Sequence, residues 1–387
     1  MTFLTKYKKT LIYFLLSLIP ISLGIAVYLL YPMFVKKPAP IEELVVQPVL
    51  ELEEPEVAEV MNAPETEFLS QYSDKGLDYD LTEIDGTPNK NMFADITSPK
   101  FLDVSAETKL EDTELVASFH IKDDYRAYPI SYMYYHHLVN DTFGNQPVLI
   151  SFCGICNSAI AFNPVVNDQS LSFGVLGVLY HNDLVMYDRE TDSWWVQVTG
   201  DGISGNHKGT SLEIIPGMEI VEYSDFKSGH PDGKVLQPVP GYTSQYQQFD
   251  YFDIAEERTR SGRSGAAADY NQVLGVQVRG VAKAYIFDDI EDTKVINDTL
   301  NGWSLLILKD PDDGGVRIFR RLLDDRVLDF EVVNSELKDI QTGSIWNFQG
   351  SVISGELEGE SLLQPDYLEL YKFAWEGFYP DTTYYTP

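Results

Sequence analysis

The chain is poor in cysteine: its 387 residues include only Cys153 and Cys156, in the order Cys-Gly-Ile-Cys. This count excludes a disulfide-rich secreted scaffold, an iron–sulfur cluster held by four thiolates and a complete four-cysteine zinc site within the chain. What remains is a single dithiol. A CxxC pair of this kind binds a metal, exchanges disulfides or closes a small structural bridge.

Basic residues are also scarce, since 28 Lys and Arg face 60 Asp and Glu and the net charge is −32. Such a surface repels phosphate backbones, so we expect no nucleic-acid partner. The sequence shows no P-loop, no glycine-rich dinucleotide motif and no serine triad, and it leaves open whether the protein is an enzyme. Hydrophobic residues make up 44% and aromatic residues 13%, which is enough apolar material for folded cores.

Charge is absent from residues 11–35, a run of 25 positions that follows Lys6, Lys8 and Lys9. At about 1.5 Å per residue this run spans a hydrocarbon core of about 30 Å. It lacks the small-residue cleavage site of a signal peptide, and the preceding lysines favour a cytoplasmic N-terminus. We therefore predict a single-pass membrane protein, with the bulk of the chain extracytoplasmic and the helix as its membrane contact.

The chain repeats itself. Residues 116–128 align with residues 273–285 without a gap, and further along Trp195 aligns with Trp346. An ordered series of such matches predicts a tandem duplication. The second copy has no cysteine, so we expect it to be a degenerate scaffold copy.

These observations predict an α+β fold in which an N-terminal transmembrane helix precedes two tandem, duplicated β-rich repeats with short helices. Alternating residues 115–121 favour a strand, and Pro129 suits the first turn of a short helix. The predicted parts are a cytoplasmic tail (1–10), the transmembrane anchor (11–35), an acidic proline-rich stalk (36–91), repeat 1 with the CxxC (92–240), a linker loop (241–269) and repeat 2 (270–387).

The surroundings of the dithiol favour a hairpin. An apolar strand over residues 147–152 leads into Cys153, and the matching stretch of the second copy, residues 310–315, reads Asp-Pro-Asp-Asp-Gly-Gly between two apolar strands. That is turn chemistry, so we expect the CxxC to cap a hairpin, as metal knuckles do. A thioredoxin-like site would instead begin a helix whose dipole lowers the thiol pKa.

Three functions remain open on this evidence. In the first, Cys153 and Cys156 bind one soft or borderline metal ion, copper or zinc, with His136 and His181 as further candidate ligands. In the second, the same cysteines are catalytic in thiol–disulfide exchange. In the third, they form an inert disulfide in a structural or interaction module. The first two imply a metal or thiol partner protein.

The sequence resembles the bacterial family of the domain of unknown function 3179. The resemblance rests on residues 126–129, on His136 with residues 139–141, and on residues 147–162 and 173–195. It covers most of residues 92–387. It implies that the membrane is a bacterial inner (plasma) membrane and that the bulk of the chain is periplasmic. It implies that a further set of positions matches the family motif beside His136 and the two cysteines: Asn157, Asp183, Asp188 and Arg189.

Overall fold

The computed structural model describes residues 79–246, 270–290, 295–311 and 315–386, and strands dominate this part of the chain. Strand residues make up 47% and helical residues 13%, so the expectation of an α+β fold is wrong. Two-residue connections are one reason, because they leave no room for a helix. At Arg279 and Gly280, for example, φ is +50° and +80°, as in the tight turns that join antiparallel strands.

The predicted cytoplasmic tail, transmembrane anchor and most of the stalk lie outside the described residues, as does most of the linker loop. Within the described ranges, no helix has both the length and the apolar character that crossing a bilayer requires.

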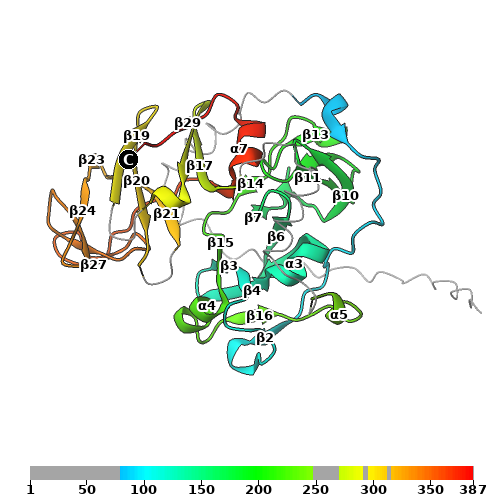
Figure 1. The fold of residues 1–387 in the computed structure, drawn as a ribbon, viewed down its shortest axis with the longest axis horizontal. Coiled ribbons are helices and arrows are strands. Elements are labelled where there is room, and N and C mark those ends of the chain that lie inside the picture. Colours follow the sequence, from blue (N-terminus) through cyan, green and yellow to red (C-terminus); the bar gives the residue numbers. More distant parts are fainter. Residues whose placement is uncertain (1–78, 247–269, 291–294, 312–314, 387) are drawn as a thin grey trace, which may run out of the picture. The chain divides into compact units, whose positions relative to one another are not determined.

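The first half of the described chain forms three sheets, coloured cyan to green in Figure 1. In sheet order, the first contains β1 (Ile84–Asp85), β10 (Phe173–Tyr180), β11 (Asp183–Asp188), β12 (Trp194–Val196) and β13 (Gly202–Ser204). The second contains β14 (Glu213–Ile214), β7 (Ser158–Asn163), β6 (Gln146–Cys153) and β5 (Leu138–Phe143). The third contains β15 (Glu219–Glu222), β3 (Leu115–Ile121), β4 (Asp124–Pro129), β16 (Lys234–Leu236) and β2 (Phe101–Asp103). A short pair, β8 (Val165–Val166) and β9 (Gln169–Ser170), stands apart from these sheets.

In the second half, yellow to red in Figure 1, the described sheets repeat this strand order with one strand fewer in each. One sheet contains β28 (Leu368–Tyr371), β17 (Gln272–Val278), β18 (Val281–Ile286) and β29 (Thr383–Tyr384). Another contains β19 (Val295–Leu300), β20 (Trp303–Lys309) and β21 (Val316–Arg320), and a third contains β24 (Phe330–Val333), β25 (Glu336–Asp339), β26 (Ile345–Trp346) and β27 (Val352–Ser354). The strands β22 (Leu322–Leu323) and β23 (Arg326–Val327) form a separate pair.

Equivalent side-chain contacts and strand pairings recur in the two halves. The side chain of Asn140 exchanges hydrogen bonds with the backbone of Phe173, and that of Asn297 does so with Phe330, 33 residues further on in both cases. In each half one strand joins its sheet in parallel, β16 beside β4 and β29 beside β18, whereas the other ladder pairs are antiparallel. The aligned sequence stretches therefore adopt the same pairings.

Helices are short and lie between strands. They are α3 (Ile130–His136), α4 (Tyr223–Gly229), α5 (Thr243–Tyr246) and α7 (Lys372–Phe378), with single 3-10 turns η1 (Leu81–Glu83), η2 (Val104–Ala106), η3 (Gly205–His207) and η4 (Phe287–Asp289). Helices of seven residues gain little from their own hydrogen bonds and depend on packing against the sheets. α4 and α7 occupy equivalent places, after β15 and β28 respectively.

One hydrophobic cluster joins the two halves. It contains the dithiol and Trp195 from the first half together with Trp375 and Phe378 from α7 in the second. Trp375 fits over Gly275 of β17, where an added Cβ would lie only 2.3 Å from the indole ring. The dithiol therefore lies inside the shared core.

Candidate dithiol–carboxylate site

The two cysteines lie at the tip of the β6–β7 hairpin, as the turn chemistry predicted. Cys153 ends β6 and pairs with Ser158 at the start of β7, so residues 154–157 make the turn. Asn157 takes a φ of +55°, a left-handed conformation that asparagine tolerates better than most residues. A side chain at Gly154 would meet the ring of Tyr134 on α3 at 2.8 Å, which fixes how closely the turn approaches that helix.

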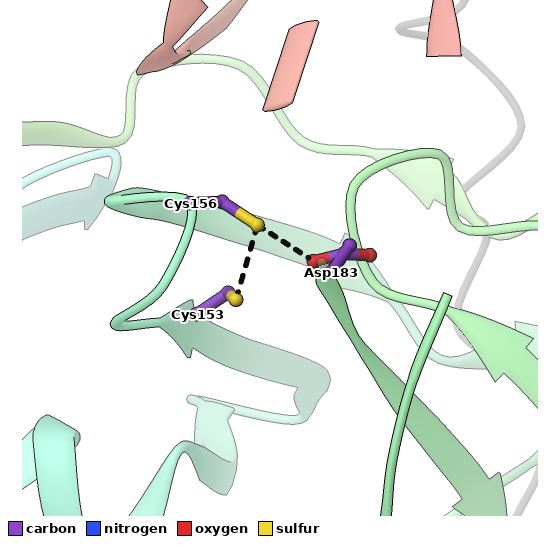
Figure 2. A group of neighbouring side chains, drawn as sticks. All are labelled: Cys153, Cys156 and Asp183. Atoms are coloured by element: carbon purple, nitrogen blue, oxygen red, sulfur yellow. Dashed lines mark hydrogen bonds between the residues drawn. The ribbon is translucent and has the colours of Figure 1, made fainter. Parts of the chain in front are cut away.

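Asp183 completes a group of three at this tip. It begins β11, directly after a tight turn in which His181 and Asn182 have φ of +49° and +67°. Figure 2 shows the sulfur of Cys156 between the Cys153 sulfur and the Asp183 carboxylate, at 3.2 Å from Cys153 Sγ and 3.4 Å from Asp183 Oδ1. The candidate ligand atoms of these three residues all lie within 4.8 Å of one another, and all three residues are buried.

The two thiols differ in acidity. Burial raises the pKa of the Cys153 thiol, but its hydrogen bonds with the Cys156 thiol and with backbone groups outweigh burial and lower the pKa to about 6. Burial and the charge on Cys153 raise the pKa of Cys156 well above its usual value. Cys153 is therefore the more acidic thiol of the pair.

The carboxyl group of Asp183 is buried, which disfavours its charged form. Burial, together with the charge on Cys153, raises the pKa of its carboxyl well above the usual range. The backbone N–H of Val198 donates to Oδ2 at 2.8 Å and the Cys156 thiol faces Oδ1. Chemically, the group offers two sulfurs and one oxygen whose negative charges a bound cation would stabilise.

The structure does not bring His136 into this group. The ring is fully buried at the end of α3, where Nδ1–H donates to the carbonyl of Ala94 and Nε2 accepts from the Tyr246 hydroxyl. Burial lowers the pKa of the imidazole, which favours this neutral form. Both ring nitrogens are thus engaged by protein groups.

His181 is also placed apart from the dithiol group. Its Nδ1 lies 2.5 Å from the carbonyl oxygen of Gly377 in the second half, and its Nε2 lies 2.7 Å from a carboxylate oxygen of Glu83. The side chain therefore connects the two halves through the β10–β11 turn.

The remaining motif positions have architectural contacts. Asp188 is fully buried and accepts from the indole N–H of Trp195 at 3.0 Å. Arg189 donates to the carbonyl of Phe173 at 2.5 Å and to Asp95 at 2.6 Å. Neither residue belongs to the dithiol group.

Asp183 was a motif position in the sequence and was not predicted to be a ligand. In the sequence, the only local feature that marks Asp183 is that an acid begins an apolar strand directly after a turn. In the second half, the place equivalent to Cys153 holds Asp310, which is buried and forms an ion pair with Arg317 at 3.1 Å. The second half thus balances its buried acid with an arginine, whereas the first half has a thiol pair.

Together, the duplicated β-rich fold and the buried dithiol–carboxylate group define a protein with one cysteine-based site in its first half. The family model described as "Protein of unknown function (DUF3179)" matches residues 90–382. The chain belongs to this family, and the resemblance seen in the sequence is confirmed. No curated protein and no solved structure matches the chain.

Proposed function

We propose that the protein binds one soft or borderline metal ion, of the copper or zinc class, through Cys153, Cys156 and Asp183. The observation that carries this proposal is the convergence of three ligand atoms in a buried group. Asp183 stands in this proposal where the sequence predicted a histidine.

The charges of the group support this assignment. The raised pKa values of Cys156 and Asp183 mean that burial disfavours their anionic forms, and a bound cation reverses that preference. Two sulfurs with one carboxylate oxygen are ligands that zinc accepts together, whereas Cu(I) prefers sulfur alone. Within the proposed class, the donor set therefore favours zinc. A metal-donating or metal-accepting protein is the partner that this function implies.

Metal content and thiol counting on the purified full-length chain test the proposal. We expect one metal ion per chain by elemental analysis, protection of both thiols while the ion is bound, and loss of the ion in Cys153→Ser. Asp183→Asn keeps the shape of the side chain and should weaken binding by about tenfold or more, a loss on the scale seen when metal sites lose a supporting group.

A matched control separates the two candidate third ligands. His136→Asn should leave metal stoichiometry unchanged, because both nitrogens of His136 are already hydrogen-bonded elsewhere. Loss of metal in His136→Asn with full retention in Asp183→Asn would contradict the assignment of Asp183. Absence of metal from the folded, reduced wild-type chain, even after zinc is added, would contradict the function itself.

Thiol–disulfide exchange is the second candidate, and the difference in acidity between the two thiols favours it. A Cys153 thiolate near pKa 6 would attack, and Cys156 would resolve the mixed disulfide. Burial opposes this function, because Cys153 is 2% exposed and Cys156 is fully buried, whereas reactive cysteines are partly exposed. A disulfide potential above about −300 mV together with no bound metal would favour exchange.

The location of the chain stays a prediction, since the expected anchor lies outside the described residues. The uncharged residues 11–35, with lysines before them, support the prediction that residues 38–387 lie outside the cytoplasm. Protease added to intact cells whose outer envelope is permeabilised should then digest the folded part of the chain. Complete protection of that part would contradict the predicted topology.

A further inference from the structure

A cleft of about 310 Å³ lies next to the dithiol turn and has no role in the proposed metal site. Asn157, which directly follows Cys156, forms part of its lining. The other walls come from β15, α4 and the start of β3 in the first half and from η4, β28 and the start of β21 in the second.

The polar lining of this cleft is acidic. It contains Glu219, Glu222, Asp225 and Glu369, and none of its described lining residues is a lysine or arginine. Arg317 is not among the lining residues, but its guanidinium donates to both carboxylate oxygens of Glu219, at 2.5 and 2.7 Å. Among the described lining residues and Arg317, acids therefore outnumber bases, which favours a cation as the ligand of the cleft.

Asn157 adds an unsatisfied acceptor to this acidic lining. The residue is only 6% exposed, and in the described part of the structure its Oδ1 atom has no hydrogen-bond partner. A buried carbonyl oxygen without a donor is unfavourable, so a ligand that donates to it is stabilised. Its amide nitrogen is engaged, since it donates to Gln272 at 2.9 Å.

A short hydrogen-bond chain connects Asn157 to the acids. Gln272 accepts from Asn157 and donates in turn to Glu369 at 3.2 Å. Glu369 is half-buried; burial and the neighbouring Glu219 raise its pKa to about 7, against the opposing effects of Gln272 and Arg317. A cation in the cleft would stabilise the charged form of Glu369.

The rest of the lining is apolar and consists of Leu115, Ile220, Val221, Phe287 and Val316, with Gly315 beside them. A hydrated inorganic cation gains nothing from such walls. An aliphatic stem does, because methylene groups pack along apolar surface while a charged head reaches polar groups. An ammonium head has three donors and no acceptor, which suits Asn157 Oδ1 and two carboxylates.

We propose that this cleft binds a primary alkylammonium group, with the ammonium at Asn157, Glu219 and Glu369 and the methylene stem against the apolar walls. The ligand is a lysine side chain of a partner peptide or a free aliphatic amine. The proposal does not depend on metal binding at the dithiol.

Calorimetric titration of the full-length chain tests this cleft, at about pH 8 so that Glu369 is charged. Diaminopentane represents a free amine, and a blocked Ala-Lys-Ala peptide represents a protein lysine; whichever binds more tightly identifies the source. Pentanediol is the neutral control of matched shape. We expect at least one ammonium probe to bind about tenfold or more tightly than pentanediol.

Two variants assign the binding to the cleft. Glu369→Gln is nearly isosteric, and Asn157→Gly removes the amide while keeping a residue that tolerates positive φ. Each variant should lower the affinity for the ammonium probe by about tenfold or more. Asn167→Gly is the matched control, since exposed Asn167 also has a positive φ, +50°, and is not among the lining residues.

Three results would overturn the proposal. One is that neither ammonium probe binds more tightly than pentanediol. Another is wild-type affinity in the folded Glu369→Gln or Asn157→Gly variant. The last is complete displacement of the amine by about one equivalent of Mg²⁺, which would identify an inorganic cation site.

Discussion

Replacing Trp346 by alanine should strongly destabilise the protein. The indole is 1% exposed, makes an edge-to-face contact with Phe330 at 5.3 Å between ring centroids, and donates from Nε1 to Asp339 at 3.0 Å. Removing a buried tryptophan costs about 3–5 kcal/mol. The buried carboxylate also loses a charge-assisted hydrogen bond, which is worth about 1.5–3 kcal/mol. Because these contributions overlap, we expect a total of about 4–6 kcal/mol.

The phenylalanine variant separates the two contributions. Trp346→Phe keeps much of the ring but not the N–H, so it should cost about 1.5–3 kcal/mol. Urea unfolding followed by far-UV circular dichroism measures each loss.

The equivalent tryptophan of the first half provides the test of the reasoning. Trp195 is fully buried, contacts Phe173 edge-to-face at 5.7 Å and donates to Asp188 at 3.0 Å. Trp195→Ala should therefore match Trp346→Ala to within about 1 kcal/mol, while half-buried Trp194 should cost less than half as much. A loss below about 1 kcal/mol in Trp346→Ala, or a difference above about 2 kcal/mol between the two buried positions, would refute the equivalence of the halves.

Three further outcomes are expected. Metal affinity should fall at least tenfold per pH unit below neutrality, because the raised pKa values of Cys156 and Asp183 require the metal to displace protons. Competition titrations at several pH values measure this affinity, and a pH-independent affinity would count against the site. Arg126→Met should cost about 3–5 kcal/mol in urea unfolding, because it removes the 2.8 Å ion pair of the buried Asp141; a negligible loss would show that the pair contributes little. Burial raises the pKa of Asp298, but lysine and tyrosine hydrogen bonds outweigh burial and lower it, so its contribution to stability is present above about pH 4 and is lost as pH falls through the folded-state pKa. Asp298→Asn should therefore reduce the loss of stability between about pH 4 and pH 2, and an unchanged acid profile would contradict this sign.

Local features of the fold could be read from the sequence. The strand predicted at residues 115–121 coincides with β3, and the turn at Cys153 follows from residues that are neighbours in the chain. Such features depend on short-range backbone preferences and on alternating burial, and both are visible in a single sequence. The α+β class was wrong, because the helices are single short segments between strands and strand residues dominate the described chain.

The membership of the site depended on contacts that are distant in sequence. Asp183 reaches the dithiol because the β10–β11 turn places it there, 27 residues beyond Cys156. His136 has the right chemistry for a ligand, yet Tyr246, 110 residues away, occupies its second nitrogen. The acidic cleft likewise needs Glu369 from the second half beside Asn157 from the first.

The sequence by itself determined that the chain has one dithiol, that this dithiol lies in a hairpin turn, and which family the chain belongs to, because each of these depends on residues close together in the chain. The tertiary structure alone decided that the third member of the group is a carboxylate and that both histidines bond elsewhere. The physical reason is that a side chain's partners are set by strand register and by packing between sheets, where each donor or acceptor is satisfied by whichever group the fold brings within reach.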